Sequence, residues 1–348
     1  MSGIVKVLIG GSPCTHWSIS QKKSRETTAS GIGWELFKNY LIAKQRFQPD
    51  LFLYENNASA AQLIKDQISY ELQTDLQYIN SALVSGQARN RFYGHNFGAV
   101  PMPEDRGIIL RDILDADGAP LEKAYTLQTT KAGAAPDEAN EPLRIGVIEN
   151  NAKKPAFDSK QYRVYSPNGK STTLCGEGGG LGAKTGLYAC PPCDGDERKP
   201  IYEVRNGLVE ISGQFVPVRL ADGCYIIRKL TVSECCRLQT MPEDYCRAVS
   251  PTQAYRGIGN GWTAEVIIHL PSHALKGIPK NEEILVLSMY DGIGTGSYCL
   301  EKLGYRNIKY YAYEIDKYAM QIANSNFKDI IQCGDAFRVW ERDWRMPI

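Results

Sequence analysis

The chain has 348 residues, of which 43% are hydrophobic and 23% are charged, a balance typical of a globular protein with one large core and a smaller one. Its formal net charge of +1 means that a nucleic-acid partner would have to be held by a local basic surface. No segment approaches the roughly 18 consecutive apolar residues of a membrane span, and the first residues lack the features of a secretory leader. We therefore expect a soluble, cytoplasmic protein whose ten cysteines are reduced thiols, one of them available as a nucleophile.

The N-terminal part of the chain alternates between strand and helix patterns. Residues 5–9 are a β-branched run that ends at Gly-Gly-Ser-Pro, residues 10–13, which predicts a buried strand followed by a tight loop. Helical spacing of apolar residues predicts a helix over 34–46, and residues 51–54 predict a second strand that ends at Glu-Asn-Asn, 55–57. Strand, helix and strand at this spacing favour parallel α/β construction.

The middle of the chain has a different character. Residues 131–142 are small, acidic and proline-bearing, which is typical of a linker or exposed loop. Residues 155–225 are rich in glycine, proline and short β-like runs, which predicts a separate, smaller and irregular β-rich domain. We expect the boundaries of this domain at 151–250, between segments 1–150 and 251–348.

The α/β pattern returns towards the C-terminal end. Strand patterns at 284–290, 309–313 and 330–332 alternate with helix patterns at 298–303 and 317–327. This alternation predicts that the second α/β segment adds further strands to a parallel sheet.

A glycine-rich turn follows the first strand of this segment, with Tyr290, Asp291, Gly292, Gly294 and Gly296 in sequence. Glycines at the start of a helix let a cofactor approach the backbone. The spacing is not Gly-x-Gly-x-x-Gly, and a plain strand-to-helix turn can give a similar sequence.

Acidic residues follow the next two strands. Glu314, with Ile315 after it, ends the second strand, where a carboxylate can accept hydrogen bonds from ribose hydroxyls. This pattern suits NAD as well as S-adenosylmethionine. Asp335 follows the third strand and could accept a hydrogen bond from an adenine amino group, which favours S-adenosylmethionine.

Cys14 lies on the loop that follows the first strand, at the sheet edge where open α/β folds keep their chemistry. A lone cysteine is more often a small buried apolar residue than a nucleophile. However, Pro13-Cys14, Glu-Asn-Asn at 55–57 and Gln-Ala-Arg-Asn-Arg at 87–91 together resemble the Pro-Cys, Glu-Asn-Val and Gln-x-Arg-x-Arg motifs of the DNA (cytosine-5) methyltransferases.

Further blocks extend this resemblance over about half of the chain. Residues 163–174 resemble a stretch of bacterial and phage members, and residues 228–239 resemble the motif that precedes the last helix of the family. Gly-Asn-Gly-Trp-Thr at 259–263, with Asn260 and Trp262, resembles the final motif, which closes the cofactor pocket.

Three residues depart from the family pattern: Asn57 stands for the usual Val, Tyr290 stands for the usual Phe, and Trp262 is similar to the de novo methyltransferases of animals. The order of the motifs departs further, because the family places the cofactor motifs first and here they follow the catalytic ones. The chain is therefore identified as a circularly permuted member. In such a member both termini lie side by side, and strand 5–9 runs parallel to strand 284–288.

The resemblance implies an S-adenosylmethionine-dependent methyltransferase (Rossmann-like) fold with a mostly parallel sheet. Segment 1–150 would be the nucleophile half of the catalytic domain, 251–348 the cofactor-binding half, and 151–250 the target-recognition domain. Residues 153–229 contain 12 Lys and Arg against 8 Asp and Glu, a mild excess that suits contact with the DNA backbone and that an ordinary solvated surface can also show.

The resemblance also implies the chemistry. Cys14, after Pro13, would add to C6 of cytosine, Glu55 would protonate or hydrogen-bond N3, and Arg91, with Arg89, would hold O2. The target cytosine must first be flipped out of double-stranded DNA. S-adenosylmethionine would be bound by these residues: Tyr290, Asp291, Gly292, Gly294, Gly296, Glu314, Ile315, Asp335, Asn260 and Trp262.

Other functions remain open at this point. A tRNA cytosine methyltransferase uses the same chemistry, and an inactive DNA-binding homologue would share the fold, although the presence of Cys14, Glu55 and Arg91 argues against it. The Cys-Pro-Pro-Cys sequence at 190–193 could form half of a zinc site with Cys175 or Cys224 nearby. A zinc-dependent cytosine deaminase is excluded, because none of the four histidines (His16, His95, His269 and His273) begins the His-x-Glu sequence of that class.

Overall fold

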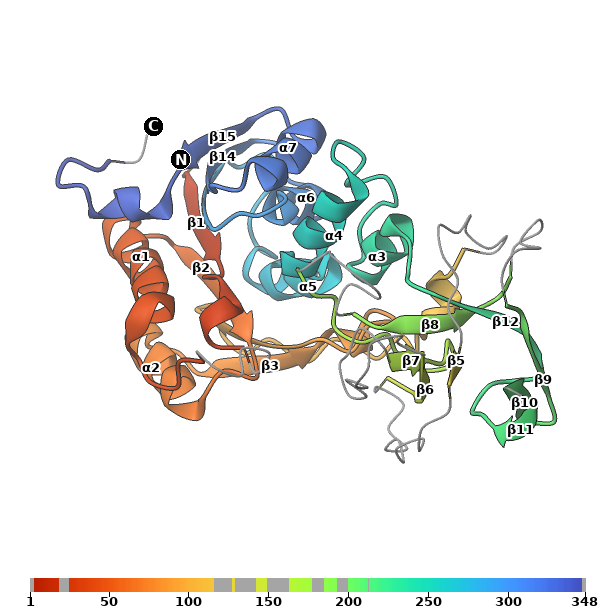
Figure 1. Cartoon of the computed structure of the whole chain (residues 1–348). Coiled ribbons are helices and arrows are strands. Elements are labelled where there is room, and N and C mark those ends of the chain that lie inside the picture. Colours follow the sequence, from red (N-terminus) through yellow and green to blue (C-terminus); the bar gives the residue numbers. More distant parts are fainter. Residues whose placement is uncertain are drawn as a thin grey trace. The chain divides into compact units, whose positions relative to one another are not determined.

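The computed structural model of the chain is shown in Figure 1. The structure describes residues 3–18, 25–115, 127–128, 142–148, 163–176, 185–192, 200–211 and 213–345. It has two compact units, each made of segments that are distant in sequence. The first contains Met1–Asn80, Asn90–Pro103 and Ala264–Ile348, and the second contains Ser81–Arg89 and Glu104–Thr263.

The first unit is built on a seven-stranded sheet with the order β15-β14-β13-β1-β2-β4-β3. Neighbouring strands from β15 to β2 are parallel, and β4 is antiparallel to both β2 and β3. The strands are β1 (Val5–Gly10), β2 (Leu51–Asn57), β3 (Leu76–Asn80), β4 (Asn90–His95), β13 (Ile284–Met289), β14 (Ile308–Tyr313) and β15 (Ile330–Gly334). The expected mixed α/β fold is therefore confirmed.

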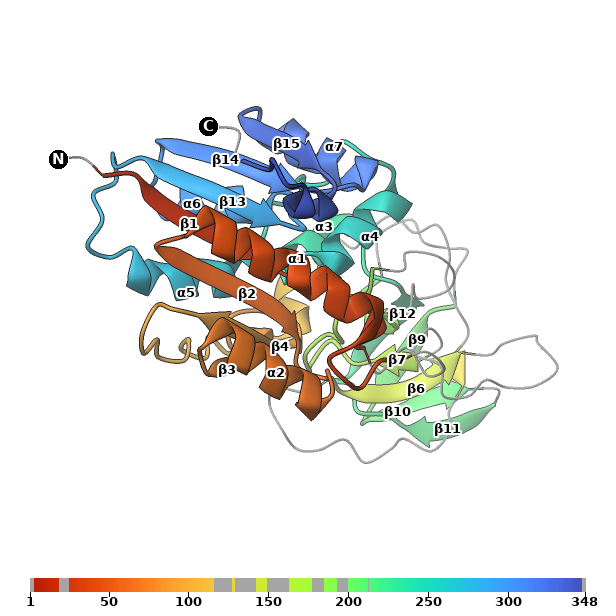
Figure 2. The same cartoon turned by 90° about the vertical axis from the view of Figure 1, so that its left-hand side faces the viewer.

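Both ends of the chain contribute to this sheet. β1 pairs with β13 in parallel, with Val5 opposite Ile284 and Gly10 opposite Met289, as predicted. Figure 2 shows the two strands side by side. Their near-continuous apolar sequences fit this position, because a central parallel strand is buried on both faces.

Helices cover both faces of the sheet (Figures 1 and 2). α1 (Gly31–Phe47) and α2 (Gln62–Leu72) lie on one face, and α5 (Ala264–Ala274), α6 (Thr295–Lys302) and α7 (Lys317–Asn326) lie on the other. Buried aromatic residues at helical spacing on α1, among them Phe37 and Tyr40, pack against Leu8 and Tyr54 of the sheet. Burial of each large apolar side chain contributes about 1.5–3 kcal/mol.

Several elements differ from the sequence-based expectations. β2 continues to Asn57, so the Glu-Asn-Asn sequence ends the strand and does not follow it, because β4 pairs with it up to that point. α6 begins at Thr295, three residues earlier than expected. The strands β3 and β4 were not predicted.

The second unit contains an eight-stranded sheet with the order β11-β10-β9-β12-β8-β7-β6-β5. Its pairs are antiparallel except for β7 and β8. The strands are β5 (Leu127–Gln128), β6 (Arg144–Ile148), β7 (Arg163–Tyr165), β8 (Leu187–Cys190), β9 (Tyr202–Arg205), β10 (Leu208–Ile211), β11 (Gln214–Pro217) and β12 (Gly223–Arg228). In the described part of 155–225 every regular element is a strand, as the sequence predicts.

Two short helices follow this sheet, α3 (Val232–Leu238) and α4 (Pro251–Asn260). The unit is larger than the expected segment 151–250, because earlier residues bond into it: the buried Lys170 ammonium donates to the carbonyls of Ala82 and Ser85 at 2.7 and 3.2 Å. The predicted linker lies outside the described residues, apart from its last residue, Pro142. No helix in the described ranges has the length and apolar character needed to cross a bilayer.

Candidate active site

The candidate site residues of the first unit converge at the carboxyl edge of its sheet. Gly10 pairs with Met289 and with Tyr54, and Met289 pairs with Tyr313. Four adjacent parallel strands therefore end at the same level. The loops that follow them carry Cys14, Tyr290 and Glu314, and Glu55 lies one residue beyond Tyr54.

Cys14 begins a short 3-10 turn, η1 (Cys14–His16), with Pro13 as its N-terminal cap. Two glycines let the chain reach this turn between its neighbours. A Cβ on Gly10 would lie 2.5 Å from the Met289 carbonyl oxygen, and a Cβ on Gly11 would lie 2.6 Å from that of Glu55. The Cys14 thiol is free and partly exposed, as a nucleophile requires.

A buried polar cluster holds the loop before Cys14 against β2. The Ser12 and Tyr54 hydroxyls are 2.7 Å apart, and the Asn56 amide donates to the Ser12 carbonyl at 2.9 Å and to the Tyr54 hydroxyl at 3.0 Å. Burial raises the pKa of Tyr54, so its phenol stays neutral and can donate. Asn56 thus acts on the nucleophile turn through the backbone of Ser12.

Glu55 and Arg91 form an ion pair between β2 and β4. Arg91 Nε lies 2.8 Å from Glu55 Oε1, and the two side chains are only 10% and 11% exposed. Arg91 also donates to the Asn90 carbonyl at 2.9 Å. The second carboxylate oxygen, Glu55 Oε2, lies beside Gly11 in the nucleophile loop. The structure therefore brings the expected acid and the expected cationic donor together next to the nucleophile turn.

Arg89 does not join this group. It belongs to the second unit, where its buried guanidinium donates to the carbonyls of Leu174, Gly259 and Gly261 at 3.2, 3.3 and 2.8 Å. β4 begins at Asn90, where the first unit also resumes, so Arg89 lies just before the strand that carries Arg91. These bonds hold the Arg89 guanidinium against the backbone of its own unit, and the expectation that Arg89 holds the cytosine O2 stays a prediction.

The glycine turn after β13 has several residues with positive φ, as its glycine content suggests. Tyr290, Gly292 and Gly294 have φ values of 60°, 66° and 80°, in the left-handed region that favours glycine. A Cβ on Gly292 would meet nothing within 4 Å, so this glycine faces open space.

Gly294 and Gly296 are required for close packing, a reason that the sequence did not indicate. A Cβ on Gly294 would lie 3.1 Å from that of Ala323 in α7, and one on Gly296 would clash with Ile9 and the Tyr310 hydroxyl. These glycines allow close packing of α6 inside the protein. The expectation that Gly294 and Gly296 contact a cofactor stays a prediction.

Glu314 contacts the glycine turn directly. Its Oε2 accepts from the Gly292 amide at 2.8 Å, and its Oε1 accepts from the amides of Ile315 and Asp316 at 2.8 Å. Ile315 is 71% exposed. Asp335 caps the 3-10 helix η6 (Ala336–Trp340) by accepting from the Phe337 amide at 2.9 Å. The carboxylates chosen from sequence spacing thus end adjacent strands, at one edge.

Asp291 is buried at the start of the glycine turn. Its Oδ1 accepts from the Ser288 hydroxyl at 2.7 Å and from the Tyr310 hydroxyl at 2.6 Å. Its Oδ2 is buried and has no hydrogen-bond partner among the described residues. Burial, with a smaller effect from Glu314, raises the pKa of Asp291 to about 6. A buried carboxylate oxygen without a partner is a site that a cationic ligand group can satisfy.

Sequence reasoning missed the polar residues that organise this edge. Ser288 stands inside an otherwise apolar strand, Tyr310 stands in the neighbouring strand β14, and Ser12 of the nucleophile loop bonds to Tyr54 of β2. A hydroxyl in a fully buried strand needs a buried partner, and this signal could have identified Ser288 and Tyr310 before the structure.

Asn260 and Trp262 belong to the second unit. Asn260 ends α4, and its side chain packs against the Gly176 backbone so closely that a Cβ on Gly176 would clash with it. Trp262 is half-buried.

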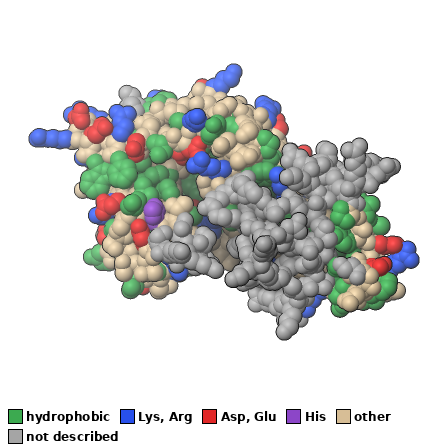
Figure 3. All heavy atoms as spheres, viewed as in Figure 1, with side chains coloured by type: hydrophobic (Ala, Val, Ile, Leu, Met, Phe, Trp, Pro, Cys, Tyr) green, Lys and Arg blue, Asp and Glu red, His purple; other side chains and the backbone are tan. Residues whose placement is uncertain are grey.

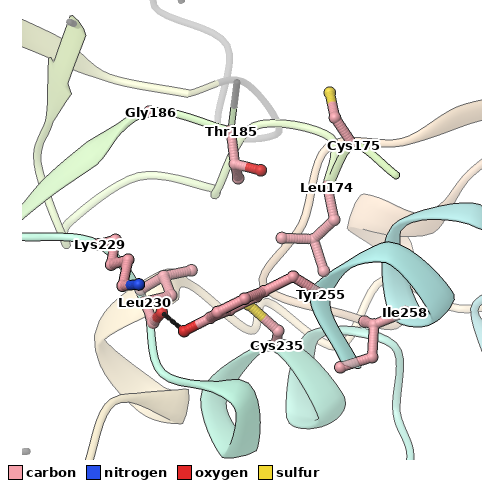
Figure 4. A pocket seen from close by; sticks show the side chains of 9 residues that line it. All are labelled: Leu174, Cys175, Thr185, Gly186, Lys229, Leu230, Cys235, Tyr255 and Ile258. Atoms are coloured by element: carbon pink, nitrogen blue, oxygen red, sulfur yellow. Dashed lines mark hydrogen bonds between the residues drawn. The ribbon is translucent and has the colours of Figure 1, made fainter. Parts of the chain in front are cut away.

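The second unit also contains a small apolar cavity, lined by Leu174, Tyr255 and Ile258 among others (Figure 4). Lys229 lies over the Tyr255 ring, and no carboxylate is found among the described residues that line the cavity. The carboxylates expected to bind a ribose or an ammonium group lie at the sheet edge of the first unit.

The described residues contain no cluster of three His, Cys, Asp or Glu side chains suited to a metal ion. Cys190 is buried in β8, and Cys193 lies outside the described residues. Figure 3 shows basic, acidic and hydrophobic side chains interspersed on the visible face of the first unit.

Comparison with known families gives one match. A model of the C-5 cytosine-specific DNA methylase family matches residues 2–82 and 124–274, together two thirds of the chain. The matched ranges include Cys14 and Glu55, but not the glycine turn, Glu314 or Asp335. No curated protein matches the chain.

Proposed function

The chain belongs to the C-5 cytosine-specific DNA methylase family, and we propose that it transfers the methyl group of S-adenosylmethionine to C5 of a flipped cytosine in double-stranded DNA, with Cys14 as the nucleophile. The family is one of cytosine methyltransferases. The observation that carries the proposal is the meeting of the Cys14 turn, the Glu55–Arg91 pair and the Asp291–Glu314 edge at the carboxyl ends of adjacent strands.

Cys14 supplies the attacking sulfur. The thiolate forms a bond to C6 of cytosine, the C5–C6 π electrons make C5 nucleophilic, and charge moves towards N3. A thiol is intrinsically nucleophilic even when only a small fraction is ionised at neutral pH. Once C5 carries the methyl group, loss of the C5 proton and departure of the Cys14 sulfur restore the aromatic ring.

Glu55 and Arg91 act on the charge that this addition creates. Glu55 places a carboxyl group beside the nucleophile loop, where it can protonate or hydrogen-bond N3. Arg91 fixes the orientation of that carboxyl group at 2.8 Å and offers further N–H donors to the base. Because both side chains are largely buried, their positions are set before the substrate binds.

The residues of the edge fit S-adenosylmethionine. Bound there, this molecule would supply an electrophilic methyl group on a sulfonium. Asp291 Oδ2, buried and without a partner in the described structure, would accept the positive charge of the methionine part. Glu314 would accept ribose hydroxyls, and Ile315 and Asp335 would flank and bond the adenine. On the resemblance alone, we assign Asn260 and Trp262 to the binding of S-adenosylmethionine.

We further propose that the chain is a circularly permuted, Rossmann-like methyltransferase. A family model read in its usual order would match the catalytic and recognition parts and leave the displaced cofactor part unmatched, and residues 275–348 are unmatched. The last turn of α1 also touches both ends of the chain. The Phe47 carbonyl accepts from Lys6 Nζ at 3.3 Å, and Arg46 donates to the Glu341 carbonyl at 2.6 Å.

We assign recognition of the target DNA to the second unit, which contains the whole of segment 151–250. The test of the function compares methyl transfer from labelled S-adenosylmethionine to duplex DNA and to tRNA, followed by bisulfite sequencing of the DNA product. Methylated cytosine in duplex DNA is the expected result. Methyl transfer to tRNA alone would mean that the substrate is tRNA and not DNA. Methyl transfer to neither would overturn the proposal.

A further inference from the structure

We propose that Glu26 is a positioning residue for Cys14, because its carboxylate ties the turn that carries the nucleophile to the first turn of α1. The inference rests on the proposed function of Cys14. Neither Glu26 nor the Gly-Ile-Gly sequence at 31–33 belongs to the motifs that identify the site.

The Glu26 carboxylate bonds to both sides of this junction. Its Oε2 accepts from the Trp17 indole at 3.2 Å and from the Gly33 amide at 3.1 Å, and its Oε1 lies 3.3 Å from the same amide nitrogen. His16 Nδ1 lies 3.6 Å from Oε1. One side chain therefore contacts the nucleophile turn and the helix together.

On the nucleophile side, Trp17 transmits the position of Glu26 to Cys14. Trp17 is the C-terminal cap of the turn, its amide donates to the Cys14 carbonyl at 3.1 Å, and its side chain is completely buried. The Glu26 amide also donates to the His16 carbonyl at 2.9 Å. Because Trp17 is held both by its buried indole and by its backbone amide, the turn has little freedom to rotate.

On the helix side, Glu26 replaces a missing cap. Ser30 is the N-cap of α1 but makes no side-chain capping bond. The amide of the third helical residue, Gly33, normally finds its acceptor in such a cap; here it finds the Glu26 carboxylate. The negative charge is also favourable at the positive end of a 17-residue helix.

Gly31 and Gly33 leave room for the Glu26 carboxylate and the Trp17 indole. A Cβ on Gly33 would lie 2.5 Å from Trp17 Nε1 and 2.6 Å from Glu26 Oε2, and one on Gly31 would lie 2.6 Å from Glu26 Oε1. The indole and the carboxylate fill the space that side chains would need. The Gly-Ile-Gly sequence therefore belongs with Glu26 and Trp17 as one device.

Arg25 extends the same connection to the strand that carries Glu55. Its Nε donates to the Trp17 carbonyl at 3.2 Å, and its Nη2 donates to the Ser59 carbonyl at 2.5 Å. Ser59 lies two residues beyond the end of β2. Arg25 thus connects the nucleophile turn to the segment that follows β2.

The test compares Glu26→Ala and Glu26→Gln with Glu35→Ala. Glu35 is a matched control, because it lies near the start of the helix that Glu26 contacts, its side chain is 45% exposed, and its ion pair among the described residues is with Lys38. Each variant is measured for kcat, for S-adenosylmethionine affinity, for Tm, and for the rate at which iodoacetamide alkylates Cys14, followed by peptide mass spectrometry. The alkylation rate reports the surroundings of Cys14 without requiring methyl transfer.

Glu26→Ala should lower kcat by about tenfold or more, because displacement of a reacting group by about 1 Å can cost a hundredfold. It should change the Cys14 alkylation rate and leave S-adenosylmethionine affinity unchanged. Glu26→Gln keeps an acceptor oxygen and should recover most of the loss, and Glu35→Ala should match the parent. If Glu26→Ala does not fold, Trp17→Phe removes the indole donor together with part of the buried ring and should change kcat and alkylation in the same direction.

A parent-like kcat and alkylation rate in Glu26→Ala would overturn the inference. So would a loss that follows Tm alone, with no recovery in Glu26→Gln. Failure of the proposed function gives a different result, in which the parent itself transfers no methyl group, while the alkylation rates still show whether Glu26 positions Cys14.

Discussion

Arg91 Nε lies 2.8 Å from Glu55 Oε1, and the two side chains are exposed by only 10% and 11%. The pair joins two antiparallel strands, one of which leads back to the nucleophile edge and the other to the second unit. A buried ion pair adds little stability in itself, but removal of one partner leaves a buried charge that is expensive. Glu55 and Arg91 are therefore coupled in stability as well as in the proposed chemistry.

Glu55→Ala should destabilise the protein by about 3 kcal/mol, because it leaves the Arg91 guanidinium buried without its carboxylate. The double variant Glu55→Leu with Arg91→Met should be more stable than Glu55→Ala while being inactive. Urea unfolding measures both. Lys38→Ala, which breaks the exposed Glu35–Lys38 pair, should cost less than about 1 kcal/mol. Equal losses at the two sites would contradict the buried-pair account.

Asp291 should make stability depend on pH. Its folded-state pKa of about 6 lies above the ordinary value of 3.8, so the folded state keeps a proton that the unfolded state releases. Protonated Asp291 therefore contributes about 3 kcal/mol to the free energy of unfolding. This contribution is complete below pH 3.8 and is lost as the pH rises through 6.

Asp291→Asn should therefore be more stable than the parent at pH 8 and close to it at pH 4. The same substitution should weaken S-adenosylmethionine binding, since it removes the proposed acceptor of the positive charge. Thermal unfolding between pH 4 and 8, with calorimetry at pH 8, measures the two effects. Identical pH profiles for parent and variant would mean that Asp291 titrates normally.

Tyr290→Phe should destabilise the protein, although Phe is usual at this position in the family. Its hydroxyl donates to the Leu36 carbonyl at 2.8 Å and accepts from the Asn39 amide at 2.9 Å, and Asn39 is completely buried. Tyr290→Phe leaves that amide without its acceptor, at a cost of about 1–3 kcal/mol. Addition of Asn39→Leu removes the unpaired amide but also the acceptor of the Trp340 indole, so it should recover only part of the loss in urea unfolding. A neutral Tyr290→Phe would show that the amide finds another partner.

The order of the motifs can be reversed by design. Joining residue 348 to residue 1 through a short flexible linker, and opening the chain between 276 and 282, should give an active enzyme with the cofactor motifs first. This opening avoids α5, which ends at Ala274, and β13, which begins at Ile284. Activity and Tm are the measurements. A folded but inactive rearranged protein would count against adjacent termini, which tolerance of permutation requires.

The sheet edge was predictable because its signals are local. Apolar strands followed by glycine, cysteine or acidic residues identified β1, β13 and β14 and placed Cys14 and Glu314 at their ends. β3 (Leu76–Asn80) and β4 (Asn90–His95) were missed because both contain polar residues. Which of these residues are buried depends on the elements that cover each strand. Strand pattern depends on what covers each face.

The roles of single residues were harder to predict. Arg89 and Arg91 are alike in sequence, yet one donates to three backbone carbonyls and the other pairs with Glu55. Gly292, Gly294 and Gly296 also differ, because one faces open space and two pack against α7, β1 and β14. Such distinctions depend on contacts between distant segments, which sequence spacing does not give.

The most direct test of the account is a covalent trap on Cys14. Duplex DNA with 5-fluorocytosine at the target position is incubated with S-adenosylmethionine and either the parent or Cys14→Ala. Fluorine cannot leave C5 as a proton, so the parent should accumulate a stable protein–DNA adduct, and mass spectrometry should place the modification on Cys14. Cys14→Ala should form no adduct and still bind S-adenosylmethionine. An adduct or continued methyl transfer in Cys14→Ala would contradict the central claim that this thiol is the nucleophile.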